Sequence, residues 1–144
     1  MDSIKVSDFD LLFAVPIDIP VGKKGKKFIL NMNKYRVAHW HILQEAKVNF
    51  NEMVAGLNLN DGEACFPFRN PVRFTYFYYP PTKRSYDRMN VLSVVDKFVC
   101  DALIKEKILV DDDYERVLTP KFLHCGVDAE NPRVLVGVKE IING

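Results

Sequence analysis

Residues 83–113 read KRSYDRMNVLSVVDKFVCDALIKEKILVDDD, and they predict a long helix with carboxylates at both of its ends. At 100° per residue, most apolar side chains between positions 91 and 103 fall on one side of this helix and should face a core. The polar residues form a stripe along the edge of that side: Asp87, Asn90, Lys97 and Asp101. Asp96 lies about 180° from Asp87 around a straight helix. We therefore do not expect these two carboxylates to hold one metal ion.

Three aspartates, Asp111 to Asp113, follow the predicted helix. A chain reversal after Val110 would bring Asp111 or Asp112 back toward the polar stripe. Mg²⁺ takes oxygen ligands in an octahedron and keeps several waters, so two or three carboxylates suffice for a site. A bound Mg²⁺ activates a water and stabilises charge on a phosphate, and Lys97 would add a fixed positive charge for the same anion. The alternatives are structural: Asp87 as a helix N-cap, the aspartate triplet as a solvated turn, and Lys97 as a solvated lysine.

The rest of the chain alternates between strand and helix patterns. Val72 to Tyr79 is almost entirely β-branched or aromatic and predicts a buried strand. From about Tyr35 to Val54, apolar residues recur at three- and four-residue steps, which predicts an amphipathic helix. Further strands are expected at residues 9–17, 28–32, 117–124 and 133–141. The order β(β)αβαββ predicts an α/β or α+β fold, with two main helices and a mixed β-sheet in one compact domain over residues 1–144.

The composition limits the class of protein. With 144 residues, 48% of them hydrophobic, the chain suits one folded domain rather than a disordered segment. Its net charge of +1 excludes a histone-like polycation, so any nucleic-acid surface would be a local patch. Three cysteines without a CxxC pair, and no signal-peptide pattern, indicate a reducing cytosol. No apolar run is long enough for a membrane span. We therefore expect a cytoplasmic protein without a membrane partner.

Basic residues gather around the first predicted helix and before the second. The loop Gly22–Lys27 carries four lysines that can neutralise DNA phosphates, although a purely solubilising role is the alternative. The candidate DNA-binding residues are Lys23, Lys24, Lys26, Lys27, Lys34, Arg36, Lys83, Arg84 and Arg88. Such contacts would read the shape and charge of DNA rather than its base sequence.

Trp40 lies between His39 and His41. Two histidines at positions i and i+2 of a helix point in different directions, so we do not expect them to share a metal ion. We expect Trp40 in the core, with nucleotide stacking as the alternative.

The region from Arg84 to about Val117 resembles the RusA-type Holliday junction resolvases, a family of endodeoxyribonucleases common in phages and prophages. In that family a basic run precedes an Asp-x-Asp-Asn motif, and a lysine, an Asp-Ala-Leu sequence and an Asp-Asp pair follow. Here Lys97 stands four residues before Asp101-Ala102-Leu103, and Asp111-Asp112 follows Asp101 at the family spacing of ten and eleven. The chain departs from the motif because it reads Asp87-Arg88-Met89-Asn90, without the second aspartate, and about four extra residues precede Lys97.

The resemblance implies that Asp87 and Asp112 bind metal and that Lys97 is the catalytic lysine. Asp96 or Asp101 would supply the charge of the missing motif aspartate, or Asn90 would serve as a neutral oxygen ligand, and Asp111 is a further candidate ligand. The resemblance also implies a homodimer that uses Mg²⁺ or Mn²⁺ to nick two strands of a four-way DNA junction, in DNA recombination and repair. The rival predictions are a catalytically weak or inactive junction-binding protein of the same fold, and a protein-interaction domain without a DNA role.

Overall fold

A four-stranded mixed β-sheet forms the centre of the computed structural model, which describes residues 4–22, 25–60, 65–83 and 88–142. The strand order is β1 (Leu11–Val15), β6 (Arg133–Glu140), β4 (Val72–Tyr79) and β5 (Lys121–His124). β6 pairs antiparallel with both β1 and β4, whereas β4 and β5 run parallel. The buried strand predicted from its β-branched and aromatic residues is β4, and it lies in the interior of the sheet.

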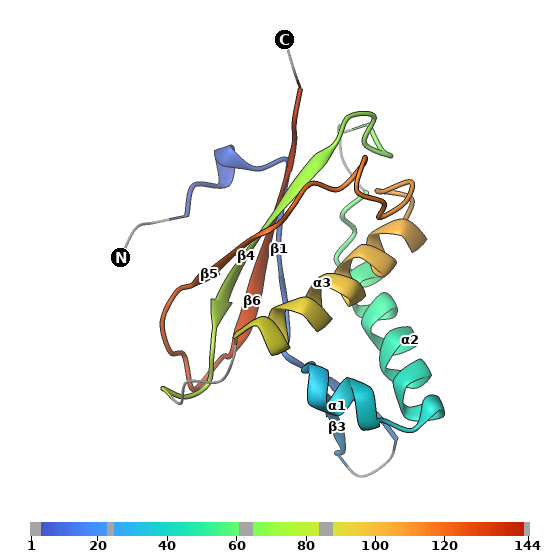
Figure 1. The fold of residues 1–144 in the computed structure, drawn as a ribbon, viewed down its shortest axis with the longest axis vertical. Coiled ribbons are helices and arrows are strands. Elements are labelled where there is room, and N and C mark those ends of the chain that lie inside the picture. The colour runs from blue at the N-terminus through green and yellow to red at the C-terminus, as the bar shows by residue number, and fades with distance from the viewer. Residues whose placement is uncertain (1–3, 23–24, 61–64, 84–87, 143–144) are drawn as a thin grey trace.

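Two long helices lie on one side of this sheet: α2 (Trp40–Gly56) and α3 (Arg88–Lys105). Figure 1 shows α3 between the sheet and α2. Phe98 of α3 packs against Phe50 of α2, with ring centroids 5.4 Å apart. Because α3 is covered by the sheet and by α2, its buried surface is wider than one amphipathic face. The buried residues of α3 are Val91, Leu92, Val94, Val95, Phe98, Val99, Cys100, Ala102 and Leu103.

The first third of the chain differs from the sequence prediction. β1 ends before Pro16, and the chain then forms a separate two-stranded sheet from β2 (Asp18–Pro20) and β3 (Lys27–Ile29). The single helix predicted from Tyr35 to Val54 is wrong. Two helices, α1 (Met32–Val37) and α2, are separated at Ala38 and His39, which have extended ψ angles of 139° and 142°.

The second face of the sheet is covered near one end by the N-terminal segment. A short 3₁₀ helix, η1 (Val6–Asp8), precedes Phe9, whose ring packs edge-on against Phe77 at 5.8 Å. Phe9 also lies directly over Gly137 of β6, where an added Cβ atom would be 2.6 Å from the ring. Glycine at position 137 is therefore what permits the N-terminal segment to approach the sheet so closely.

The architecture confirms a single compact α+β domain with a mixed sheet and two main helices. The predicted strand 117–124 is shorter in the structure, because β5 begins at Lys121 and Val117 forms only an isolated bridge with Val72. Across the described residues, no helix combines the length and the apolar content that a membrane crossing requires.

Candidate metal and phosphate site

Asp96 lies on the side of α3 that faces the sheet and is half-buried there. The hydroxyl of Tyr76, a fully buried residue of β4, donates a hydrogen bond to Oδ1 of Asp96. The thiol of Cys100, one helical turn further along α3, donates to the same oxygen at 3.7 Å. Among the described residues, both donors thus converge on one oxygen of the carboxylate and leave the other oxygen for a further ligand.

The pKa of Asp96 is raised, mainly by burial and in smaller part by the negative charge of Asp112, while the hydrogen bonds from Tyr76 and Cys100 oppose the rise. Burial also raises the pKa of Tyr76 well above its usual range, and the Asp96 charge adds to that shift. The pKa of the Cys100 thiol is raised for the same two reasons. Tyr76 and Cys100 are therefore protonated near neutral pH and act as neutral donors to Asp96. Because its pKa is raised, the Cys100 thiol is not an activated nucleophile.

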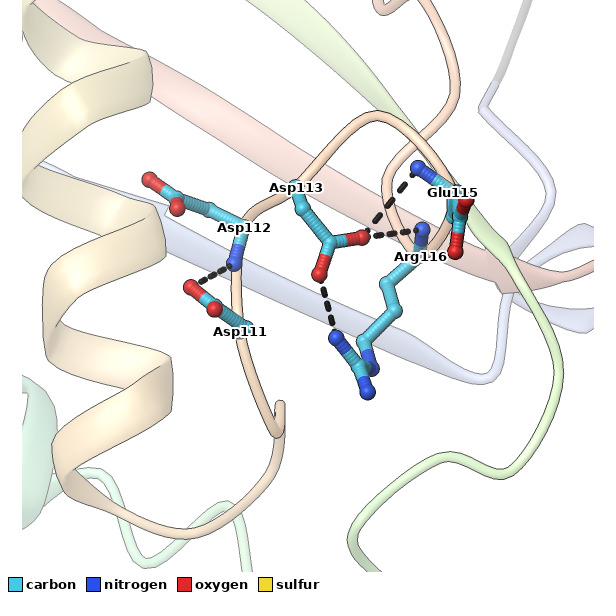
Figure 2. Close-up of polar contacts among 5 residues, drawn as sticks. All are labelled: Asp111, Asp112, Asp113, Glu115 and Arg116. Atoms are coloured by element: carbon cyan, nitrogen blue, oxygen red, sulfur yellow. Dashed lines mark hydrogen bonds and ion pairs between the residues drawn. The ribbon is translucent and has the colours of Figure 1, made fainter.

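The aspartate triplet lies in the loop that leads from α3 toward β5, and its members have different roles (Figure 2). Oδ1 of Asp111 accepts a hydrogen bond from the backbone N–H of Asp112 at 2.8 Å. Asp113 accepts from the backbone N–H groups of Glu115 at 3.1 Å and Arg116 at 3.0 Å, and it pairs with the Arg116 guanidinium. These contacts build the turn. In Figure 2 the Asp112 carboxylate takes no part in them and points toward α3.

Asp112 is close enough to the acids of α3 for their charges to interact. Partial burial is the first cause of its raised pKa, followed by the hydrogen-bonded Asp111 and then by the charge of Asp101. Asp112 in turn raises the pKa values of Asp96 and Cys100. Because like charges raise one another's pKa values, a cation placed between Asp96 and Asp112 would remove a repulsion that the fold contains.

The carboxylates are neighbours, but they do not converge on one point in this conformation. Within the described parts of the chain, no group of three His, Cys, Asp or Glu side chains is close enough to hold one metal ion. Oxygen donors of this kind suit Mg²⁺ or Mn²⁺, which need few protein ligands because they keep bound waters. The donor chemistry therefore fits such an ion, with Asp96 and Asp112 as the central pair.

Lys97 follows Asp96 on α3 and is exposed, and its ammonium group lies 5.5 Å from the centroid of the Tyr35 ring. Lys47 of α2 approaches the same ring at 6.0 Å. Neither lysine has an ion-pair partner among the described residues. Two ammonium groups at one aromatic ring repel each other, so this cluster from α1, α2 and α3 suits an anion such as a phosphate.

The structure places the other predicted residues as follows. Asp101 is exposed on α3 beside Asp112, and Asn90 is half-buried in the first turn of α3. Several basic candidates are exposed: Lys26, Lys27, Lys34, Arg36 and Lys83. The predicted metal ligand Asp87 and the predicted DNA contacts Lys23, Lys24 and Arg84 lie outside the described residues, as does the side chain of Arg88.

The surroundings of Asp96 differ from those that the sequence predicts. The apolar pattern assigns one side of α3 to the core, whereas α3 is buried against both the sheet and α2, so the buried surface extends around to Asp96. The sequence contains a signal, because Asp96 and Cys100 stand four residues apart in a stretch in which most residues are apolar. An acid in such surroundings needs either a partner or a function.

Comparison of the chain with models of protein families and with curated protein sequences gave no match. The class defined so far is thus an α+β domain with two interacting carboxylates, one on α3 and one on the following loop, and with two lysines gathered at the Tyr35 ring.

Proposed function

We propose that this chain is a Mg²⁺- or Mn²⁺-dependent, structure-selective endodeoxyribonuclease that acts on branched DNA such as a four-way junction. The observation that supports this function best is the electrostatic interaction of Asp96 on α3 with Asp112 on the following loop, each with a raised pKa. Paired acids of this kind, together with a lysine such as Lys97 of the same helix, are groups that metal-dependent phosphodiester hydrolysis uses. The resemblance of the sequence to RusA-type resolvases supports the same reaction.

In this proposal Asp96 and Asp112 hold the metal ion, which when bound would supply an activated water and neutralise charge on the phosphate. Asp101, Asn90, Asp111 and Asp87 are the further candidates for ligands or for ligands of bound water. Tyr76 and Cys100 fix the orientation of the Asp96 carboxylate through their hydrogen bonds to Oδ1. This assignment uses Asp96 for the charge of the missing motif aspartate, one of the options that the sequence leaves open.

Lys97 holds the scissile phosphate, with Lys47 beside it. Both ammonium groups lie within 6.0 Å of the Tyr35 ring centroid, so the ring fixes the region in which the two positive charges act. Their attraction for a phosphate is strongest in the transition state, where additional negative charge develops on the phosphate oxygens. A homodimer would present two such sites to the two equivalent strands of a four-way junction, and this assembly is part of the proposal.

The test is cleavage of a labelled synthetic four-way junction with Mg²⁺ or Mn²⁺, and with EDTA as the metal-free control. Asp96→Asn and Asp112→Asn should each abolish nicking while the junction is still bound in a gel shift. Glu115→Gln is the matched control, because Glu115 is an exposed acid of the same loop whose side chain makes no hydrogen bond among the described residues. Nicking by Asp112→Asn at the wild-type rate would remove the proposed site from the reaction.

One observation favours a second candidate, a junction-binding protein of the same fold with little or no catalysis. The acids in the described parts of the chain do not converge into a three-ligand group. Junction binding by the wild-type protein without any product, across a titration of both metal ions, would favour this candidate over the nuclease.

A further inference from the structure

Trp40, the only tryptophan of the chain, is on the surface. It is the first residue of α2 and is 70% exposed, and Val37 at the end of α1 is 79% exposed. The prediction that Trp40 belongs to the core is therefore wrong. Large apolar side chains that are exposed on a folded domain and lie close together along the chain are candidates for a contact surface.

The position of Trp40 at the start of α2 accounts for this exposure. His39 is extended and is the N-cap of α2, although its side chain makes no capping hydrogen bond. The buried residues of α2 are Ala46, Phe50 and Val54. Trp40 lies roughly 80° around the helix from the middle of that buried side. The chain thus begins α2 with an indole that the packing of the helix does not cover.

Three aromatic rings are grouped at this corner. The rings of His39 and His41 stack at 5.2 Å with an angle of 15° between them. This stacking arises because His39 precedes the helix, so the divergence expected for two helical positions does not apply. The ring of His41 meets Trp40 edge-on, at 6.2 Å and 80°. An edge-on contact leaves indole surface open, in agreement with the high exposure of Trp40.

Positive charge predominates in the sequence that precedes and includes the start of α2. Residues 19–44 contain six of the 20 lysines and arginines of the chain and none of its 19 aspartates and glutamates. Lys34 and Arg36 of α1 are exposed, and neither has an ion-pair partner in the described parts of the chain. A polyanion is the complementary partner for such a surface. A second copy of the same surface is not, because like charges would oppose one another.

From this arrangement we infer that Trp40, together with His41, stacks on unpaired nucleobases of DNA, while Lys34 and Arg36 contact the flanking phosphates. Aromatic rings between basic residues are the combination with which proteins bind single strands without reading sequence. The inference takes its ligand, DNA, from the proposed function. It depends on neither a metal ion nor catalysis. The unpaired bases at the centre of a branched molecule are the bases accessible to such a surface.

The experiment uses the fluorescence of Trp40 in the full chain, in EDTA and at low salt. A thymidine oligonucleotide should quench the emission and reach saturation, because a stacked base quenches the indole. An oligomer of the same length with abasic sugars carries the same phosphates without bases, and it should leave the emission nearly unchanged. Equal quenching by both oligomers would overturn the inference, since phosphate charge alone would then explain the signal.

Variants then measure the contribution of the ring by the anisotropy of a labelled oligonucleotide. Trp40→Ala should weaken binding by about 5- to 150-fold, the range for loss of one stacked base. Val48→Ala, at another exposed apolar position of α2, is the matched control and should bind within about twofold of wild type. Circular dichroism of both variants shows whether the fold is kept. An affinity of folded Trp40→Ala equal to that of the control would overturn the inference.

The outcomes also separate this inference from the proposed function. Quenching by the base-containing oligomer without junction nicking in Mg²⁺ or Mn²⁺ supports the stacking surface and contradicts the nuclease. If the protein nicks the junction but the Trp40 fluorescence is neither quenched by the oligonucleotide nor changed by salt, the stacking surface is contradicted and the nuclease is not. The absence of any DNA binding at low salt contradicts both, and would point to a protein partner for this corner of the domain.

Discussion

The hydrogen bond from Tyr76 to Asp96 gives a quantitative test of the candidate site through the variant Tyr76→Phe. This change removes one hydroxyl and leaves the ring, which stacks on Phe74 and packs against Phe122, so little apolar contact is lost. The hydroxyl is fully buried and donates to a carboxylate. Hydrogen bonds to charged groups contribute about 1.5–3 kcal/mol. For 144 residues, about 3 °C of Tm corresponds to 1 kcal/mol, so we expect Tm to fall by roughly 5–10 °C.

The pH dependence of this loss carries more information than its size. The Tyr76 hydrogen bond lowers the pKa of Asp96 against the upward shift from burial, so it stabilises the ionised form. The penalty of Tyr76→Phe should therefore be largest at pH values where Asp96 is ionised, and smaller below the pKa of Asp96, where the carboxyl is neutral.

The assay is urea unfolding followed by far-UV circular dichroism, for wild type, Tyr76→Phe, Asp96→Asn and the double variant. The coupling free energy between the two positions should be about 1.5–3 kcal/mol at pH 8 and should decrease at lower pH. A coupling near zero at pH 8, or one that does not change with pH, would refute the view that Tyr76 holds an ionised Asp96.

Two further predictions concern stability alone. Asp96→Asn should raise the free energy of unfolding at neutral pH. Because folding raises the pKa of Asp96, the stability of the wild type falls as the pH increases from 3.8 through the folded-state pKa. The amide of asparagine does not ionise, so the variant avoids that loss. In urea unfolding, the gain should vanish below pH 3.8, and a gain that persists there would contradict the assignment. Gly137→Ala should destabilise the domain by about 1–3 kcal/mol, because its Cβ would lie 2.6 Å from the Phe9 ring. Most of that penalty should disappear in the background of Phe9→Ala, and a penalty unaffected by Phe9→Ala would show that the contact is not its cause.

The parts of the fold that follow from local pattern could be predicted from the sequence. Three predictions are confirmed: the buried strand β4, the strand expected at residues 133–141, which is β6, and the long helix α3. In these segments the spacing of the apolar residues along the chain is enough to predict which side chains are buried, because the segments form the centre of the domain.

The features that depend on distant contacts could not be predicted in this way. The apolar spacing from Tyr35 to Val54 continues across the break at Ala38 and His39, so periodicity gives no sign that two helices are present. The β2–β3 pair is likewise hidden, because its strands are only three residues long.

Only part of the candidate site follows from the sequence. The spacing of Asp112, Lys97 and Asp101 makes them candidates, and in the structure the charge of Asp101 raises the pKa of Asp112. The role of Asp96 depends on Tyr76, which stands 20 residues earlier in the chain, and on the close approach of β4 to α3. The Lys47 and Lys97 pair depends on Tyr35, which the sequence did not single out. The surroundings of Asp96, Lys47 and Lys97 thus depend on contacts with residues of other segments, which the local sequence pattern does not reveal.

Binding of Mn²⁺ to the DNA-free protein, measured by isothermal titration calorimetry at fixed pH, tests most directly whether Asp96 and Asp112 share one divalent cation. Wild type and Glu115→Gln should bind with the same affinity, whereas Asp96→Asn and Asp112→Asn should each lose at least about tenfold. The loss in the double variant should be smaller than the two single losses combined in free energy, because both carboxylates act on one ion. Unchanged Mn²⁺ affinity in either single variant would contradict the shared site.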